Sequence, residues 1–269
     1  MMKILILGDV CGTSGMEALK SNLKNIIKDK NIDFTIVNGE NAAETGKGIT
    51  KQNLQDLLNI GVDVITSGNH IWDQKEILDV IDIEKRLIRP SNLFEGQPGN
   101  GFGIFKIKNK KIAVINLIGN VFMKKSEDVF VSARKLIKKI KLKENVDFII
   151  VDLHGEITSE KMAMGHFLDG KVTSLVGTHT HVPTSDTKIL SKGTAYQSDL
   201  GMCGDYDSVI GMNKENSLKR FLKDPSAKQH FPSTGKASIC GVIVEADENS
   251  GLAKKVNQII LGGVLQEKK

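Results

Sequence analysis

The sequence predicts an α/β fold with a mainly parallel sheet, extended toward the C-terminus by antiparallel strands. Two observations support this prediction. Up to residue 176, short apolar runs alternate with stretches of helical periodicity, which is typical of β–α–β units whose helices cover the faces of a sheet. Beyond that point the apolar runs come in pairs. Such pairs predict hairpins, which add antiparallel strands to the fold and allow for a second sheet.

The first third of the chain predicts three strand–helix pairs. Residues 3–7 form an apolar run of strand length, and residues 15–30 repeat apolar positions at helical spacing, with Ser14 as the expected N-cap. The next two pairs are strand 34–37 with helix 50–59, and strand 62–66 with helix 73–80. Thr50 is the expected N-cap of the second helix.

The remaining elements follow the same two patterns. A hairpin around Asn109 comes first, followed by further strand–helix alternation and two C-terminal hairpins. The expected strands are 102–107, 111–118, 148–153, 172–176, 188–190, 194–197, 238–245 and 253–261, and the expected helices are 130–143 and 158–165. Residues 89–103, rich in Pro and Gly, are the best candidate boundary. The stretch is short, so we expect a loop within one domain spanning residues 1–269.

Composition indicates an ordinary globular protein of a reducing compartment. Hydrophobic residues make up 40% and charged residues 26% of the chain. The net charge of +5 permits an anionic or nucleic-acid partner without requiring one. The three cysteines are far apart, which favours free thiols. The N-terminal apolar run is too short for a signal peptide and no run is long enough to span a membrane, so we expect a cytoplasmic protein.

Side chains that bind metal ions follow five of the predicted strands. In chain order they are Asp9; Glu40 and Asn41; Asn69 and His70; His154; and His179 and His181. In an open parallel sheet these positions share one edge, outside the carboxyl ends of the strands, where ligands bind. Asn and Asp also favour ordinary turns. However, five such turns that also carry imidazoles favour a ligand site over a set of unrelated turns.

The donor types predict transition metals. Mixed carboxylate, amide and imidazole groups suit Fe, Mn or Zn better than Ca or Mg. Seven of these eight side chains already exceed what one tetrahedral zinc needs, so two ions that share a bridging carboxylate fit better. Such a pair activates water for attack on phosphorus. A purely structural metal site is disfavoured by the number of ligands on glycine-containing turns.

These turns resemble the calcineurin-like metallophosphoesterase superfamily, in which Asp, an acidic residue, Gly-Asn-His, a lone His and His-x-His follow successive strands. The matching segments are Gly8-Asp9, Gly39-Glu40-Asn41, Gly68-Asn69-His70, His154, and His179-Thr180-His181. The chain departs from that pattern at Cys11, where the superfamily has histidine, and at Glu40, where Asp is usual. Both departures are similar to the YmdB-like branch, as are segments 38–43, 67–73, 89–92, 152–154, 177–182 and 192–196.

The resemblance implies a four-layer α/β/β/α sandwich with mixed sheets and a phosphodiesterase that hydrolyses 2′,3′- or 3′,5′-cyclic nucleotides through a metal-bridging hydroxide. It implies one metal held by Asp9, Glu40, Asn41 and His181, and another held by Glu40, Asn69, His154 and His179. The cofactor would be two divalent or mixed-valence ions, with Fe favoured over Mn or Zn. His70 would be a catalytic acid for the leaving oxygen.

Other polar and aromatic residues are interpreted as structural. Asn41 is preferred to Cys11 as the ligand that replaces histidine. We interpret His166 as a surface or core histidine, and His230 as lying outside the site. The basic run at 134–143 alternates with apolar residues at helical spacing, which indicates the solvated face of a helix rather than a nucleic-acid surface. Trp72 is expected to be a packing anchor.

Two alternative functions stay open at this point. The same centre could serve a phosphomonoesterase such as a nucleotidase. The chain could also be a regulatory RNA- or nucleotide-binding protein whose catalysis is incidental. We therefore expect a phosphodiester or nucleotide substrate, leave RNA and a homo-oligomer open as partners, and expect no membrane partner.

Overall fold

The computed structural model describes residues 1–268, which contain two six-stranded mixed sheets packed face to face. The first sheet has the order β12 (Ala253–Leu261), β11 (Ala237–Ala246), β10 (Met202–Asp205), β1 (Met2–Cys11), β2 (Phe34–Asn41) and β3 (Val64–Thr66). The second has the order β4 (Phe102–Ile107), β5 (Lys110–Ile118), β6 (Phe148–His154), β7 (Ser174–Thr178), β9 (Ala195–Gln197) and β8 (Lys188–Ile189).

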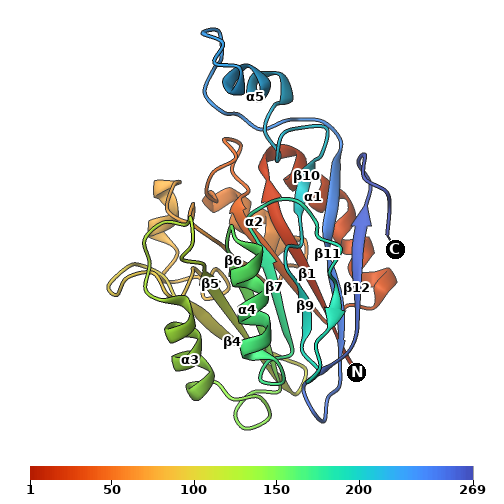
Figure 1. Cartoon of the computed structure of the whole chain (residues 1–269). Coiled ribbons are helices and arrows are strands. Elements are labelled where there is room, and N and C mark those ends of the chain that lie inside the picture. Colours follow the sequence, from red (N-terminus) through yellow and green to blue (C-terminus); the bar gives the residue numbers. More distant parts are fainter. Residues whose placement is uncertain (269) are drawn as a thin grey trace.

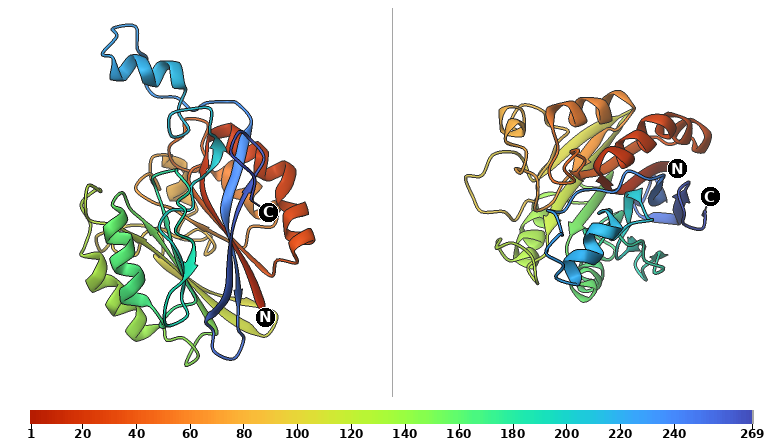
Figure 2. Two further views of the ribbon diagram at one scale, coloured as in Figure 1. Left: turned by 45° about the vertical axis from the view of Figure 1, so that its right-hand side comes forward. Right: turned by 90° about the horizontal axis from the view of Figure 1, so that it is seen from above.

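Helices cover the outer face of each sheet, as Figure 1 shows. Helices α1 (Gly12–Lys30) and α2 (Lys51–Asn59) pack on the first sheet, and α3 (Val129–Lys139) and α4 (Thr158–Leu168) pack on the second. Two turned views show the same layers (Figure 2). The predicted four-layer α/β/β/α arrangement with mixed sheets is therefore confirmed.

The apolar core has three layers, one between the two sheets and one between each sheet and its helices. The strand sequences explain this division. Successive side chains of a strand point to opposite faces. In β1, Ile4 and Ile6 join the cluster between the two sheets, whereas Leu5 and Leu7 join the cluster beneath α1 and α2. Strand β6 divides in the same way between the central cluster and the cluster beneath α3 and α4. Continuous apolar runs are needed because both faces of each central strand are buried.

Several element boundaries differ from the expectation. Helix α1 begins at Gly12, directly after β1, with Cys11 at the N-cap position, so the predicted cap at Ser14 is wrong. Gly12 has a φ of 60°, which lets the chain turn from strand to helix without a side-chain cap. Thr50 does cap α2, where its hydroxyl accepts from the amide of Asn53 in a reciprocal capping box.

Three further elements differ in type or were not expected. The stretch expected as helix 73–80 is the short 3₁₀-helix η1 (Lys75–Asp79), and α3 ends at Lys139, four residues early. Strand β10 and helix α5 (Lys214–Phe221) were not expected. Helix α5 projects from the sandwich at the top of Figure 1. No helix among residues 1–268 is both long and apolar enough to cross a membrane.

Candidate metal centre

The predicted ligands meet where the carboxyl ends of strands from both sheets converge. Asp9 lies in β1, and Glu40 and Asn41 are the last residues of β2, whereas His154 ends β6 and His179 directly follows β7. The structure brings the seven predicted ligands into one set joined by short polar contacts. The first sheet and its loops supply carboxylates and amides, and the second supplies imidazoles.

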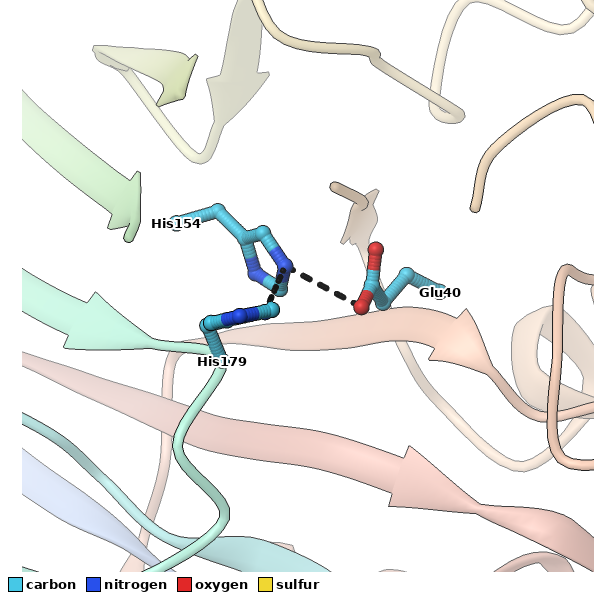
Figure 3. A group of neighbouring side chains, drawn as sticks. All are labelled: Glu40, His154 and His179. Carbon is cyan, nitrogen blue, oxygen red and sulfur yellow. Dashed lines mark hydrogen bonds and ion pairs between the residues drawn. The ribbon is translucent and has the colours of Figure 1, made fainter. Parts of the chain in front are cut away.

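One group of donors surrounds His154. Its Nε2 lies 3.0 Å from Glu40 Oε1, 3.2 Å from Asn69 Oδ1 and 3.0 Å from His179 Nδ1. Figure 3 shows the carboxylate and the two imidazoles turned toward one another. One ligand atom from each of Glu40, His154 and His179 lies within 4.8 Å of the other two, which is the spacing of groups that can share a cation.

A second group shares the Glu40 carboxylate. The amide Nδ2 of Asn41 lies 3.2 Å from Glu40 Oε1 and 3.1 Å from His181 Nε2. Asp9 accepts a hydrogen bond through Oδ2 from the backbone N–H of His179 at 3.1 Å, and its other oxygen, although buried, has no hydrogen-bond partner. A buried carboxylate oxygen without a donor is costly unless a cation or water binds it.

Outer hydrogen bonds fix two of the three imidazoles at the site, those of His154 and His181. His154 Nδ1 lies 2.9 Å from the hydroxyl of Thr178, which donates in turn to Asp152 at 2.8 Å. His181 Nδ1 donates to the carbonyl of Ile210 at 2.8 Å. When Nδ1 carries the proton, the Nε2 lone pair points to the centre and is available for a metal.

The backbone that carries the His-x-His pair is strained. His179 has a φ of 103° and His181 a φ of 67°, values in the left-handed region that cost about 1–3 kcal/mol at non-glycine residues. Lys161 donates to the carbonyl of Thr178 at 3.1 Å, and Asp199 accepts from the amide of Thr180 at 3.0 Å. These contacts hold the strained segment in place.

Burial and neighbouring charges shift the titration of the site. Burial raises the pKa of Asp9 to about 6. Burial and the charge of His154 lower the pKa of His179 to about 3, so this imidazole is neutral at pH 7. Burial opposes ionisation of the Glu40–His154 pair, but their mutual attraction lowers the pKa of Glu40 and raises the pKa of His154.

These residues fit divalent metal ions. The two donor groups share the Glu40 carboxylate, two imidazoles present Nε2, and Asp9 offers an oxygen without a donor. Rotation of the Asn41 amide by a half turn would present its oxygen, the atom that binds cations. Burial raises the pKa of Cys11 to about 12, which disfavours the thiolate that metal binding requires.

The family model described as YmdB-like protein matches residues 5–259. The chain belongs to the YmdB-like family. It is 42% identical over 260 residues to the 2′,3′-cyclic-nucleotide 2′-phosphodiesterase of Bacillus subtilis, with 97% of each chain covered. The resemblance of the turn motifs to the YmdB-like branch is thereby confirmed.

Two solved structures are similar to this YmdB-like chain, each with a TM-score of 0.90. One is a hypothetical protein from Thermus thermophilus, 36% identical, with 97% of this chain and 100% of that chain covered. The other, described as a novel phosphatase from Mycoplasma pneumoniae, is 38% identical, with 97% and 93% covered.

A cavity of about 420 Å³ opens over the metal centre. The predicted ligands Glu40, Asn41, His179 and His181 line it together with His70, and α5 contributes Phe221. The ring of His70 is 23% exposed, and its Nδ1 lies 2.6 Å from Asp73 Oδ2. His70 is therefore held by an acidic partner outside the ligand group.

Three ionisable residues of this cavity were not expected from the sequence. Glu156 Oε2 lies 3.2 Å from His179 Nε2. Lys47 and His230 lie in the cavity wall, so the interpretation of His230 as lying outside the site is wrong. Its position depends on the 206–236 segment, which returns to the site after α5, and no motif in the sequence indicates that return.

The remaining interpretations agree with the structure. His166 is exposed on α4. Trp72 packs against the cluster beneath α1 and α2. The basic residues of α3 lie opposite its buried side, where Ala133 is buried and Leu136 and Ile137 pack against the cluster beneath α3 and α4.

Proposed function

We propose that this chain is a metal-dependent phosphodiesterase that opens 2′,3′-cyclic nucleotides, with 3′,5′-cyclic nucleotides as a second candidate class. The observation that supports this most is the sharing of the buried Glu40 carboxylate by two donor groups at the floor of a nucleotide-sized cavity. The B. subtilis relative, named for the 2′,3′ reaction, supports the same choice.

Asp9, Glu40, Asn41 and His181 would hold one ion, and Glu40, Asn69, His154 and His179 the other. When bound, the two ions act as Lewis acids that offset the charge of the phosphate and make a water molecule more acidic. The mixed oxygen and nitrogen donors suit Fe first, with Mn or Zn as alternatives. Thr178 and Ile210 keep the His154 and His181 rings oriented for this role.

His70 is the proposed proton donor. Its bond to Asp73 fixes the ring and leaves Nε2 as the free ring nitrogen beside the cavity. In the reaction a water molecule loses one proton as its oxygen forms a bond to phosphorus, and the bond from phosphorus to the 2′-oxygen breaks. The 2′-oxygen takes a proton from His70 Nε2, and the proton released by the water restores His70. The product is a nucleoside 3′-phosphate.

Phe221 is the proposed platform for the base. Its side chain is 79% exposed and lies at the wall of the cavity. Stacking on an aromatic ring recognises every base through its π-face, so this contact would give little base preference.

The proposal is tested by metal analysis together with hydrolysis of bis-p-nitrophenyl phosphate, mono-p-nitrophenyl phosphate and both classes of cyclic nucleotide. We expect two transition-metal equivalents and diester turnover that is lost on chelation. Turnover of the monoester alone would instead assign a phosphomonoesterase, for which the Mycoplasma relative described as a phosphatase is the supporting observation.

We also propose that the chain forms a single domain and acts in the cytoplasm. The cluster between the sheets takes residues from both of them, which supports one cooperative unit. All three cysteines are free and buried, which suits a reducing compartment.

A further inference from the structure

A second cavity, of about 670 Å³, adjoins the cavity over the metal centre. Lys47 and His230 line both cavities, so the two spaces meet at these side chains. Arg220, Gln229 and Phe231 line the second cavity alone. The first cavity is large enough for one nucleotide, and a mononucleotide would leave the second unfilled.

The junction of the two cavities is positively charged. Among residues 1–268, neither Lys47 nor Arg220 forms an ion pair, and Arg220 uses one guanidinium N–H for the carbonyl of Lys228 at 3.1 Å. Slight burial, followed by the charges of Arg220 and Lys47, lowers the pKa of His230, as expected for cations that line the same cavity as its ring. Glu44 also lines the second cavity and is exposed, as Lys47 and Arg220 are, so the lining carries two cations against one carboxylate.

The wall beyond this junction suits a nucleobase. Phe231 is 41% exposed, and Gln229 offers amide donors and acceptors beside it. A groove that combines cations for the backbone with an exposed aromatic ring for a base is typical of single-stranded nucleic-acid sites.

We propose that the substrate is the 3′ end of an RNA strand that terminates in a 2′,3′-cyclic phosphate. The terminal nucleotide occupies the first cavity. The phosphodiester on its 5′ side lies at Lys47, Arg220 and His230, and the preceding base stacks on Phe231. This inference rests on the proposed function, since it extends the same site by one nucleotide.

Substrate chemistry agrees with this direction. In this placement the reacting 2′,3′ side faces the predicted metal ligands, which leaves the 5′ side free to reach Lys47 and His230, the residues that both cavities share. A 3′,5′-cyclic nucleotide has its 5′-oxygen inside the phosphate ring and cannot be extended there. A 2′,3′-cyclic phosphate is also the end that forms when the 2′-hydroxyl of RNA attacks its own backbone.

The test compares three substrates that share the reacting group: adenosine 2′,3′-cyclic phosphate, the same nucleotide with a 5′-phosphate, and the dinucleotide ApA 2′,3′-cyclic phosphate. We expect kcat/KM to be about fivefold or more higher for the dinucleotide than for the mononucleotide, as one stacked base provides. The advantage should shrink with added salt, because a backbone phosphate is neutralised. Equal values for all three overturn the proposal. If the 5′-phosphate alone gives the full gain in kcat/KM, the preferred substrate is a phosphorylated mononucleotide rather than an RNA strand. This outcome also overturns the proposal.

Variants locate the effect. Arg220→Ala and Phe231→Ala should each lower the ratio of dinucleotide to mononucleotide kcat/KM toward one, whereas Lys219→Ala, the adjacent cation outside both cavities, should keep it. Unchanged ratios in both groove variants overturn the placement. If no substrate is hydrolysed, the proposed function fails. In that case the groove is still tested by fluorescence anisotropy with an RNA ending in a 3′-phosphate, and binding that Arg220→Ala does not weaken overturns the inference.

Discussion

Lys161 on α4 forms a buried ion pair with Asp199, with 2.8 Å between Nζ and Oδ2. Both side chains are at most 2% exposed. Lys161 also donates to the carbonyl of Thr178, and Asp199 accepts from the amide of Thr180. The pair therefore binds the backbone on both sides of His179, which has the larger positive φ of the two histidines in the His-x-His pair.

Replacing Lys161 by Met should lower the free energy of unfolding by about 3–5 kcal/mol, because Asp199 keeps a buried charge without its partner. Urea denaturation followed by circular dichroism measures this loss. Lys214→Met, which removes an exposed ion pair with Asp207, should change stability little. An equally small loss for both variants would show that the buried pair does not stabilise the fold.

Glu40→Gln should abolish diester turnover and reduce metal content, because the shared carboxylate loses its charge in both donor groups. Elemental analysis and hydrolysis of bis-p-nitrophenyl phosphate measure the two effects. Glu17→Gln, an exposed change on α1, serves as the matched control. Full metal content together with full activity in Glu40→Gln would refute the shared-ligand role.

His70→Ala should retain the metal and lose turnover by about 10²–10⁴-fold, the contribution of a positioned general acid. Asp73→Asn keeps the His70 ring but loses the charged partner at 2.6 Å, so we expect a smaller loss and a shifted pH–rate profile. The profile of kcat/KM against pH distinguishes the two. A wild-type rate for His70→Ala would remove the proposed proton donor.

Thr178→Val should weaken metal binding by about 10–100-fold, because His154 loses the hydroxyl that fixes its tautomer. Asp152 loses a donor at the same time. Thr178→Ser retains the hydroxyl and is the matched comparison. Metal titration of the chelated protein measures the affinities, and indistinguishable values for Val and Ser would argue against this orienting contact.

Phe221→Ala should raise KM for cyclic mononucleotides by about 5- to 150-fold, as expected for loss of a base-stacking platform. The effect should be absent with bis-p-nitrophenyl phosphate if the ring contacts only the base. Leu222→Ala removes a neighbouring exposed side chain that lies outside the cavity and should leave KM unchanged. Equal KM changes for both variants would indicate a general disturbance of α5.

The convergence of these side chains on one site could be predicted because it depends on local signals. Glu40 and His154 lie at the C-terminal ends of strands that begin with apolar runs, and parallel strands place such ends at one edge. Lys161 could not be recognised, since a lysine on a helix ordinarily indicates a solvated face. Its burial follows from contact with Asp199, which is distant in sequence.

The elements that were missed lack the patterns on which sequence reasoning depends. Strand β10 contains only four residues, including Gly204, so it shows no alternation. Helix α5 is mostly polar and exposes Leu218 and Phe221, so it has no apolar stripe facing a core. Its role as a cavity wall arises only in the folded chain.

The side chains that meet at this site come from two different sheets. Asp9 and Glu40 lie on the first sheet, and His154 lies on the second. An ion bound there would link the two sheets at the carboxyl ends of their strands. The metal then acts as a ligand of the native state alone. For each site it raises the free energy of unfolding by RT ln(1 + [M]/Kd). The rise in melting temperature when metal is added to the chelated protein should accordingly report, without any substrate, how tightly the two sheets together bind the ion.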